Sequence, residues 1–242
     1  MRQFLGAVAG VLIVTFALSG HAFAGSVTYD LVNDWGSSNP NGTWSFYQGS
    51  NLLPYQSGNI CCGIGVPGYA PGSGQGGFLP VFFQGGNSSV INGPSTDIYV
   101  HSVDGFNGNP GAGEATLDWT APVSGTINIG GYLYYAQDPL QRSNDYTLAL
   151  GGTTLQSGTL SYANADAPAN EVTVSQTNLS VTAGEILSLV VERSPGYAPG
   201  TVTGFDLTVT ETSATAAPAP GALALLAVGL AGLGAMRRRK TA

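Results

Sequence analysis

The alternation of short β-type runs with turn residues between 25 and 213 restricts the fold of this chain more than any other feature. The runs are rich in Val, Ile, Thr, Tyr and Phe, and Gly, Asn, Ser and Pro separate them. Apolar residues nowhere in this part recur at helical spacing over three turns. We therefore expect an all-β domain. The expected strands are 26–32, 43–48, 78–83, 97–101, 114–120, 126–135, 145–150, 153–160, 171–179, 185–192 and 201–210.

Strands at this spacing are typical of a sandwich or a barrel, and we predict a two-sheet, jelly-roll-like β-sandwich. Trp44 and Phe46 should share one face of their strand, because successive side chains alternate. Gly151-Gly152 is a candidate hairpin turn, and Gly130-Gly131 predicts a bulge or bend. The Gly-, Pro- and Ser-rich stretch 49–77 is predicted to be a long loop.

The N-terminal segment has the pattern of an export signal. Arg2 is followed by an apolar stretch over 4–18, and Ala22 and Ala24 stand at the small residues of a cleavage site. We predict a signal peptide, helical before its removal, over 1–24, and a mature chain that begins at Gly25. The Sec translocon is the expected partner for export.

The C-terminal segment has three parts in a fixed order. After a linker over 213–220 comes an uncharged apolar run over 221–236, and then a basic tail over 237–242. As a helix, the apolar run would extend about 24 Å, which is somewhat shorter than the roughly 30 Å hydrocarbon core. The basic tail would remain cytoplasmic. The domain between the two terminal segments is predicted to cover 25–212.

This C-terminal order resembles the PEP-CTERM sorting signal of Gram-negative bacteria. The residues that carry the resemblance are Pro218, Ala219 and Pro220 before the helix, and Arg237, Arg238 and Arg239 after it. The family usually has Pro-Glu-Pro, and here Ala219 replaces the Glu. The resemblance implies processing by an exosortase-type transpeptidase, a transient inner-membrane anchor, and delivery to the cell surface or the extracellular polysaccharide. The alternative is an ordinary membrane anchor.

The charge of the chain is strongly divided. All 14 Asp and Glu lie between Asp30 and Glu211, together with only Arg142 and Arg193 of the seven basic residues, so this part carries 14 − 2 = 12 net negative charges. Such a surface argues against binding to nucleic acid, because phosphates require Lys and Arg. It permits a divalent cation, although solubility is the commoner reason for such a charge.

Several short motifs resemble a group of bacterial exported β-sandwich modules. They include Asn-Pro-Asn-Gly-Thr-Trp-Ser-Phe-Tyr at 39–47, Trp-Thr-Ala-Pro-Val-Ser-Gly at 119–125, and Val-Thr-Ala-Gly-Glu at 181–185. The resemblance is scattered over most of the domain. It implies a jelly roll like that of carbohydrate-binding modules, with polysaccharide as a partner, and it transfers no catalytic residue.

Tyrosines are the strongest candidates for a sugar site, which needs an apolar platform with a few polar groups. The sequence Pro-Gly-Tyr-Ala-Pro-Gly occurs at both 67–72 and 195–200. Two such loops could present Tyr69 and Tyr197 together, or the tyrosines could simply pack locally. Tyr132 and Tyr134 on the strand with the Gly pair are further candidates. The three Trp are expected in the core.

Metal and cysteine chemistry are less well defined. A structural Ca²⁺ would need oxygen ligands, which Asn33, Asp34 and Asp206 could offer, with solvated turn residues as the alternative. No other cofactor is expected. The adjacent Cys61 and Cys62 allow a vicinal disulfide, two thiols or bonds between chains.

We predict that the protein is not an enzyme. His101 is expected to be a structural histidine, and nothing in the sequence fixes the geometry of the nearby carboxylates as a glycosidase pair would require. The favoured function is polysaccharide binding or scaffolding at the cell surface. The alternatives are a structural surface protein with no small ligand and a glycan-active hydrolase.

Overall fold

A computed structural model of the chain describes the residues between the two terminal segments, except for several loops. The described residues are 25–58, 60, 65–72, 79–85, 91–105, 114–137, 140–164, 170–197 and 199–214. The predicted signal cleavage site, the sorting motif, the apolar helix and both cysteines lie outside them. Within the described part, no helix combines the length and the apolar character needed to cross a membrane.

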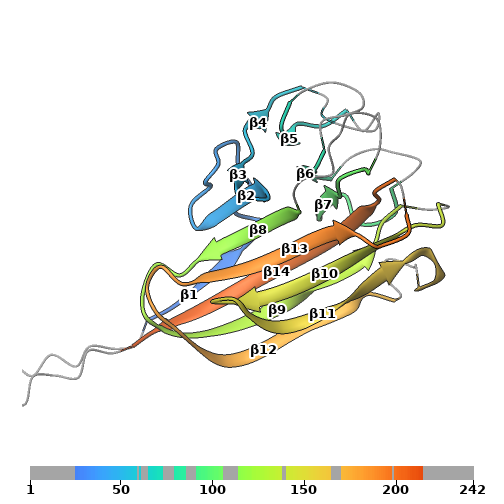
Figure 1. The fold of residues 1–242 in the computed structure, drawn as a ribbon. Helices are drawn as coiled ribbons and strands as arrows, with labels where there is room; N and C mark the ends of the chain where they lie inside the picture. Colours follow the sequence, from blue (N-terminus) through green and yellow to red (C-terminus); the bar gives the residue numbers. More distant parts are fainter. Residues whose placement is uncertain are drawn as a thin grey trace, which may run out of the picture. The chain divides into compact units, whose positions relative to one another are not determined.

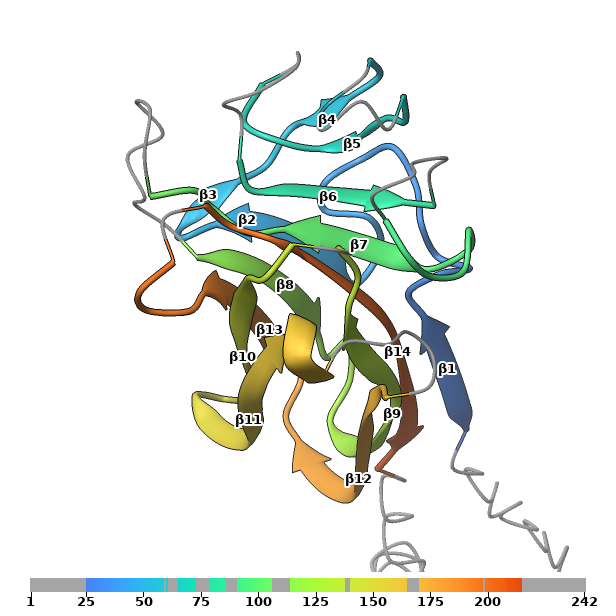
Figure 2. The same cartoon turned by 90° about the vertical axis from the view of Figure 1, so that its right-hand side faces the viewer.

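Two antiparallel sheets form the domain, as Figures 1 and 2 show. The larger sheet contains, in spatial order, β12 (Val172–Val181), β9 (Gly125–Tyr135), β14 (Val202–Ser213), β7 (Ile98–His101), β6 (Val81–Gln84), β5 (Gly68–Tyr69) and β4 (Tyr55–Gln56). Its eighth strand, β1 (Ser26–Asp30), also pairs with β14. The smaller sheet contains β11 (Thr153–Ser161), β10 (Ser143–Leu150), β13 (Ile186–Arg193), β8 (Ala115–Thr120), β2 (Trp44–Gln48) and β3 (Asn51–Leu52). The predicted all-β sandwich is confirmed.

All eleven predicted strands are present, with bounds that differ by a few residues. The hairpin at Gly151-Gly152 is also confirmed, because Leu150 pairs with Thr153 and both glycines have positive φ. The long-loop prediction for 49–77 is only partly right, since β3, β4 and β5 lie there. Each of these strands has two residues, too few for an alternating pattern to be visible.

Of the bulge or bend predicted at Gly130-Gly131, the bulge is wrong. β9 pairs with β14 in unbroken register past both glycines. The irregularity lies in the neighbouring strand, where the register between β12 and β9 shifts between Gln176 and Leu179, and where Asn178 has a φ of 56°. Gly131 instead allows a close approach, because a Cβ there would collide with the carbonyl oxygen of Asp206.

β14 is the central strand of the larger sheet. It pairs with β9 along one side, and on its other side with β7 at its beginning and with β1 toward its end. The two ends of the described domain therefore lie together, since Ser213 N donates to the carbonyl oxygen of Gly25 at 3.1 Å. This arrangement places the inward side chains of β1 between the two sheets.

The main core lies between the sheets, and it includes Trp44 and Phe46 on one face of β2, as predicted. A second apolar cluster lies on the other face of the larger sheet, because Val81 and Phe83 belong to it while Phe82 belongs to the main core. Gly204 makes room for Tyr134 in this second cluster, since a Cβ there would collide with the Tyr134 ring. Both faces of this part of the larger sheet are thus covered.

Candidate functional site

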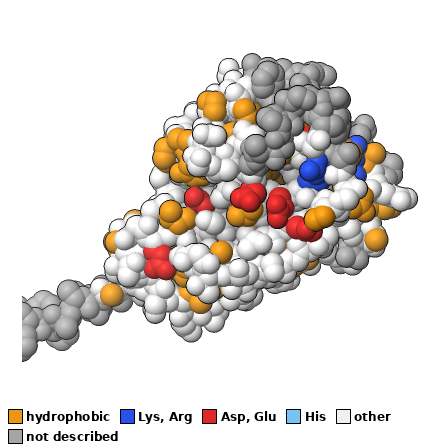
Figure 3. Space-filling view, viewed as in Figure 1, with side chains coloured by type: hydrophobic (Ala, Val, Ile, Leu, Met, Phe, Trp, Pro, Cys, Tyr) orange, Lys and Arg blue, Asp and Glu red, His pale blue; other side chains and the backbone are white. Residues whose placement is uncertain are grey.

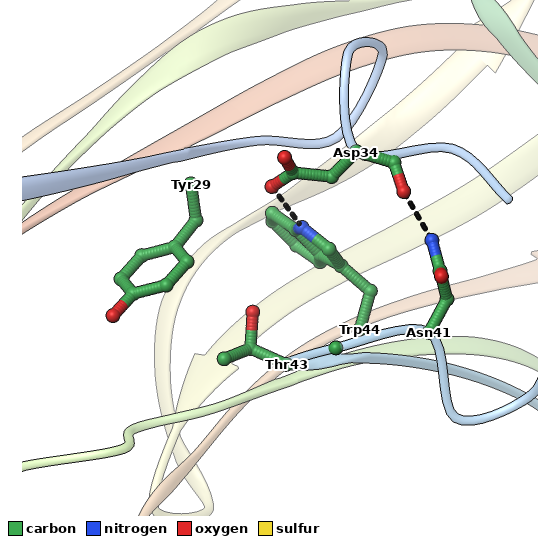
Figure 4. A pocket seen from close by; sticks show the side chains of 6 residues that line it. Tyr29, Asp34, Asn41, Thr43 and Trp44 are labelled. Atoms are coloured by element: carbon green, nitrogen blue, oxygen red, sulfur yellow. Dashed lines mark hydrogen bonds between the residues drawn. The ribbon is translucent and has the colours of Figure 1, made fainter.

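A groove opens between β1 of the larger sheet and the segment that leads into β2 of the smaller sheet. Its volume is about 320 Å³, which is the size of a small-ligand site. Figure 4 shows how side chains from both sheets surround it. The residues that line it are Tyr29, Asp34, Asn41, Gly42, Thr43 and Trp44.

A tight turn after β1 fixes one wall of the groove. The carboxylate of Asp30 accepts hydrogen bonds from the backbone and side-chain nitrogens of Asn33, at 3.0 and 2.7 Å. Asp34 N donates to Asp30 O at 2.7 Å, and Asp34 Oδ2 accepts from Asp30 N at 3.0 Å. Asn41 Nδ2 donates to the carbonyl oxygen of Asp34 and connects this turn to the opposite wall. The side chains of Asp and Asn therefore determine the local shape, as is usual for turns.

Trp44 forms the floor of the groove and is no stacking platform, because its side chain is buried. Its Nε1 donates to Asp34 Oδ2 at 3.2 Å, so the carboxylate lies over the indole edge. Tyr29 is half-buried and is the accessible aromatic side chain of the groove. Burial raises its pKa, and the carboxylates of Glu211 and Asp34 raise it further. Tyr29 therefore remains a neutral hydrogen-bond donor at physiological pH.

Polar atoms without partners gather around Tyr29. In the described part of the chain, four buried side-chain atoms have no hydrogen-bond partner: Thr43 Oγ1, Trp119 Nε1, Asp206 Oδ1 and Glu211 Oε1. Thr43 lines the groove together with Tyr29. The ring of Trp119 packs against Tyr29 with 5.5 Å between centroids, and Glu211 Oε2 accepts from the Tyr29 hydroxyl at 3.3 Å. Three of the four atoms thus belong to side chains in or next to the groove.

The groove is negative. Asp34 lines it, Glu211 lies behind Tyr29, and none of its lining residues is Arg, Lys or His. Anionic ligands would therefore be repelled, whereas neutral hydroxyl groups find both donors and acceptors.

More carboxylates lie on the outer face of the smaller sheet, where Asp145 and Glu192 are cross-strand neighbours, and acidic side chains gather on the face seen in Figure 3. Burial, then Glu114 and Asp145, raise the pKa of Glu192.

The prediction that Tyr69 forms part of a ligand surface is wrong. Tyr69 is 0% exposed in the main core, where its ring stacks on Phe46 at a centroid distance of 4.2 Å. Its hydroxyl donates to the carbonyl oxygens of Gly36 and Ser38 at 2.7 and 3.0 Å. Burial raises its pKa to about 12. Tyr197, at the equivalent position of the repeated sequence, is 40% exposed, so the two tyrosines do not form an accessible pair.

Tyr134 is also buried and therefore cannot contact a ligand from solvent, while Tyr132 is half-buried. Both hydroxyls bond to the carboxylate of Asp97, Tyr134 at 2.9 Å and Tyr132 at 3.1 Å. Asp97 itself is buried among these donors. The two hydroxyls and the carboxylate of this cluster are therefore bonded to one another, and the cluster lies on the outer face of the larger sheet.

The predicted calcium ligands do not converge. Asn33 turns an N–H donor toward Asp30, and Asp34 accepts from Trp44 and from the backbone of Asp30. Asp206 faces Asp30 and Asp97, and burial and these two carboxylates raise its pKa to about 6. Over the part of the chain that the structure describes, no group of three or more His, Cys, Asp or Glu side chains could hold a metal ion. A calcium site made of Asn33, Asp34 and Asp206 is therefore not supported.

His101 is buried, and its Nδ1 donates to the carbonyl oxygen of Ser102 at 2.8 Å. Burial lowers its pKa, so the ring is neutral near pH 7.

Two of the carboxylates near His101 in the sequence, Asp97 and Asp118, have separate partners. Asp97 bonds to Tyr132 and Tyr134, and Asp118 accepts from Ser188 Oγ at 2.6 Å. They do not face one another across a cleft.

Sequence reasoning missed Tyr29 and Thr43. The motif at 39–47 had pointed to the segment that contains Thr43, but Tyr29 lies in an ordinary alternating strand. Its partners Trp119 and Glu211 are 90 and 182 residues away in the chain, respectively, and only the sheet register brings them together. Asp34 was singled out as a metal ligand, and the structure places it in the wall of the groove instead.

Comparison with known proteins finds no matching family model and no matching curated protein. Several solved structures are weakly similar in fold. A cyclase from Fischerella sp. TAU has a TM-score of 0.37 and 14% identity over 79% of this chain and 100% of its own. The CBM22-1 xylan-binding domain from Paenibacillus barcinonensis has a TM-score of 0.34 and 10% identity over 80% of this chain and 97% of its own.

A family 35 carbohydrate binding module from Clostridium thermocellum has a TM-score of 0.30 and 13% identity, covering 53% of this chain and 86% of its own. At these scores the similarities assign neither a family nor a ligand to this chain.

Proposed function

We propose that residues 25–214 form a non-catalytic module that binds polysaccharide in the groove beside Tyr29. The observation that carries this proposal is the combination of an accessible aromatic side chain with buried polar atoms that have no partner inside the protein. A sugar presents apolar C–H faces and hydroxyl groups that both donate and accept hydrogen bonds. It therefore matches Tyr29 on one side and Thr43 on the other.

The proposal includes no catalysis. The carboxylate of Asp34 already accepts two hydrogen bonds, from Trp44 Nε1 and from Asp30 N, and Glu211 is buried behind Tyr29. A glycosidase needs two carboxyl groups that both reach the scissile bond. Of these two carboxylates, only Asp34 lines the groove, so the two do not form a pair that could both reach a bound sugar.

We further propose that the module acts outside the cytoplasm. The signal-like segment 1–24 and the PEP-CTERM-like segment 218–242 support export by the Sec translocon and processing by an exosortase-type transpeptidase. Polysaccharide binding fits delivery to the cell surface or to the extracellular polysaccharide. Intact-mass analysis of the extracellular fraction tests this part, since a mature chain that begins at Gly25 and ends before Gly221 is expected. A full-length tail in the inner membrane would contradict it.

A structural surface protein without a small ligand is the second candidate. The burial of Tyr69 and Tyr134 favours it, because aromatic residues that pack locally are what such a protein would show. The groove of about 320 Å³ favours the first candidate.

Affinity electrophoresis in gels that contain soluble β-glucan, xylan or polygalacturonate decides between the two candidates. We expect retardation by at least one neutral polysaccharide, and a weaker effect for Tyr29→Ala. Tyr162→Ala is the matched control, because Tyr162 is an exposed tyrosine of the 3-10 turn Tyr162–Asn164, outside the groove. A wild-type protein that none of the gels retards, or a Tyr162→Ala effect equal to that of Tyr29→Ala, would refute the groove as the binding site.

A further inference from the structure

The partnerless atoms beside the groove form a complementary set. Trp119 Nε1 is a donor, Glu211 Oε1 is an acceptor, and the hydroxyl of Thr43 can be both. A buried polar group without a partner is rare in folded proteins, because losing its hydrogen bonds to water is costly. Three of them belong to side chains in or next to one groove, which is an unusual concentration.

The side chains that carry the three atoms come from both sheets, and each of them neighbours Tyr29. The carbonyl oxygen of Thr43 accepts from Thr120 N at 2.9 Å, which places Thr43 next to the end of β8 that carries Trp119. Glu211 lies across the sandwich on β14. Tyr29 lies between the two sheets, with its ring against Trp119 and its hydroxyl on Glu211.

Burial separates the set into an outer and an inner part. Thr43 lines the open groove, although its Oγ1 is buried, whereas Trp119 and Glu211 are 0% and 2% exposed as whole residues. Tyr29 lines the groove in front of them, and the one hydrogen bond of its hydroxyl, to Glu211 Oε2, has a length of 3.3 Å. A bond of that length is near the limit for a useful hydrogen bond and restrains the side chain weakly.

We propose that the groove binds a neutral sugar through these atoms, with Tyr29 as a side-chain gate. This inference rests on the polysaccharide-binding function proposed above and assigns its ligand class and recognition groups. One sugar hydroxyl bonds to Thr43 Oγ1, which is buried in the free protein and belongs to a residue that lines the groove. When the Tyr29 side chain rotates outward, further sugar hydroxyls accept from Trp119 Nε1 and donate to Glu211 Oε1. The carboxylates of Asp34 and Glu211 repel uronic acids, so the site selects neutral sugars.

Thr43→Val tests the outer part because it removes the hydroxyl and keeps the shape. A hydroxyl that has no partner in the free protein contributes no hydrogen bond to folding, so the unfolding temperature should stay the same or rise. Binding of a neutral β-glucan or xylan oligosaccharide should weaken by about 3- to 10-fold, which corresponds to one neutral hydrogen bond. Thr116→Val is the matched control on the outer face of β8 and should leave binding unchanged.

Glu211→Gln tests the inner part, because it replaces a carboxylate acceptor by an amide of the same shape. We expect a loss of binding of about 10-fold or more, as for a hydrogen bond to a charged group. The same titrations include polygalacturonate oligosaccharides, which should not bind to the wild-type protein.

The outcomes separate this inference from the proposed function. If Tyr29→Ala weakens binding while Thr43→Val and Glu211→Gln bind as the wild type does, the inference is overturned and the groove function stands. A drop in the unfolding temperature of Thr43→Val would show that the hydroxyl is already satisfied in the free protein, and would also overturn it. Binding of the uronate oligosaccharide contradicts the neutral ligand class. If no neutral sugar binds to the wild type, the proposed function fails as well.

Discussion

The two ends of β14 bury polar groups in opposite ways. At its beginning, Asn144, Ser102, Thr201 and Thr203 are buried, and their polar groups are joined by hydrogen bonds, the Thr201 hydroxyl to Gln137. Asn144 Oδ1 accepts from Ser102 Oγ at 2.7 Å, and its Nδ2 donates to Thr201 O and Thr203 Oγ1 at 3.0 and 2.9 Å. Toward the end of the same strand, Glu211 leaves one oxygen without a partner.

This difference teaches that burial of polar residues does not by itself mark a functional site. A fully bonded network makes the structure rigid and specific, whereas partnerless atoms cost stability unless something else bonds to them. We therefore call the region around Asn144 the closed network, and assign the binding function to the groove beside Tyr29.

The largest effect on stability is expected when the closed network is broken. Asn144→Ala removes three hydrogen bonds and leaves Ser102 Oγ and Thr203 Oγ1 buried with fewer partners. We predict a loss of about 3 kcal/mol in the free energy of unfolding. Denaturant unfolding measures it. A loss below about 1 kcal/mol would mean that the hydrogen bonds of Asn144 contribute little to stability, which would contradict the contrast between the closed network and the groove.

A smaller effect is expected for Tyr69→Phe, which removes the hydroxyl bonds to Gly36 O and Ser38 O and keeps the ring in the core. The free energy of unfolding should fall by about 1 to 2 kcal/mol. Glycan binding per folded molecule should not change, because Tyr69 is inaccessible. Loss of binding at unchanged stability would restore the earlier prediction that this tyrosine belongs to a ligand site.

Asp206 provides the smallest and most specific effect, because its partnerless oxygen lies away from the groove. Its folded-state pKa of about 6 is above the usual 3.8, since burial and the carboxylates of Asp30 and Asp97 disfavour its charge. The folded state therefore binds more protons than the unfolded state between about pH 4 and 6, and stability falls as the pH rises through this window.

Asp206→Asn should consequently stabilise the domain at pH 7 by about 1 kcal/mol, after allowance for solvent screening of this partly exposed group. The gain should be much smaller near pH 4, because Asp206 is then protonated in the folded state and close to half protonated in the unfolded state. Thermal unfolding of the variant and the wild type at pH 4 and pH 7 measures the difference. An equal gain at both values would show that charge is not the cause.

The sequence predicted the strands well, because they are runs rich in β-branched and aromatic residues with turn residues between them. Trp44 and Phe46 on β2, and the glycine pair at 151–152, are examples of local information that determines local structure. The short strands of 49–77 carry no such pattern. The role of Gly204 could not be seen either, because it depends on Tyr134, 70 residues away in the sequence.

The candidate site was less predictable than the fold. Tyr69 and Tyr197 have identical flanking sequences, yet one is in the core and the other is exposed. What separates them is long-range pairing: Tyr69 lies on β5 between Tyr55 and Phe82, whereas Tyr197 follows the end of β13. Likewise, Tyr29 acquires its neighbours from strands far away in the sequence.

The indole N–H resonances of the three Trp provide the most direct test of the groove as the sugar-binding site. We propose to titrate ¹⁵N-labelled domain with a neutral β-glucan or xylan oligosaccharide and to record its amide and indole spectrum. The indole N–H signals of Trp44 and Trp119 and the amide of Thr43 should shift, while the amide of Tyr197 should not. Shifts confined to the residues around Tyr197, or no shift with any neutral sugar, would contradict the groove as the binding site.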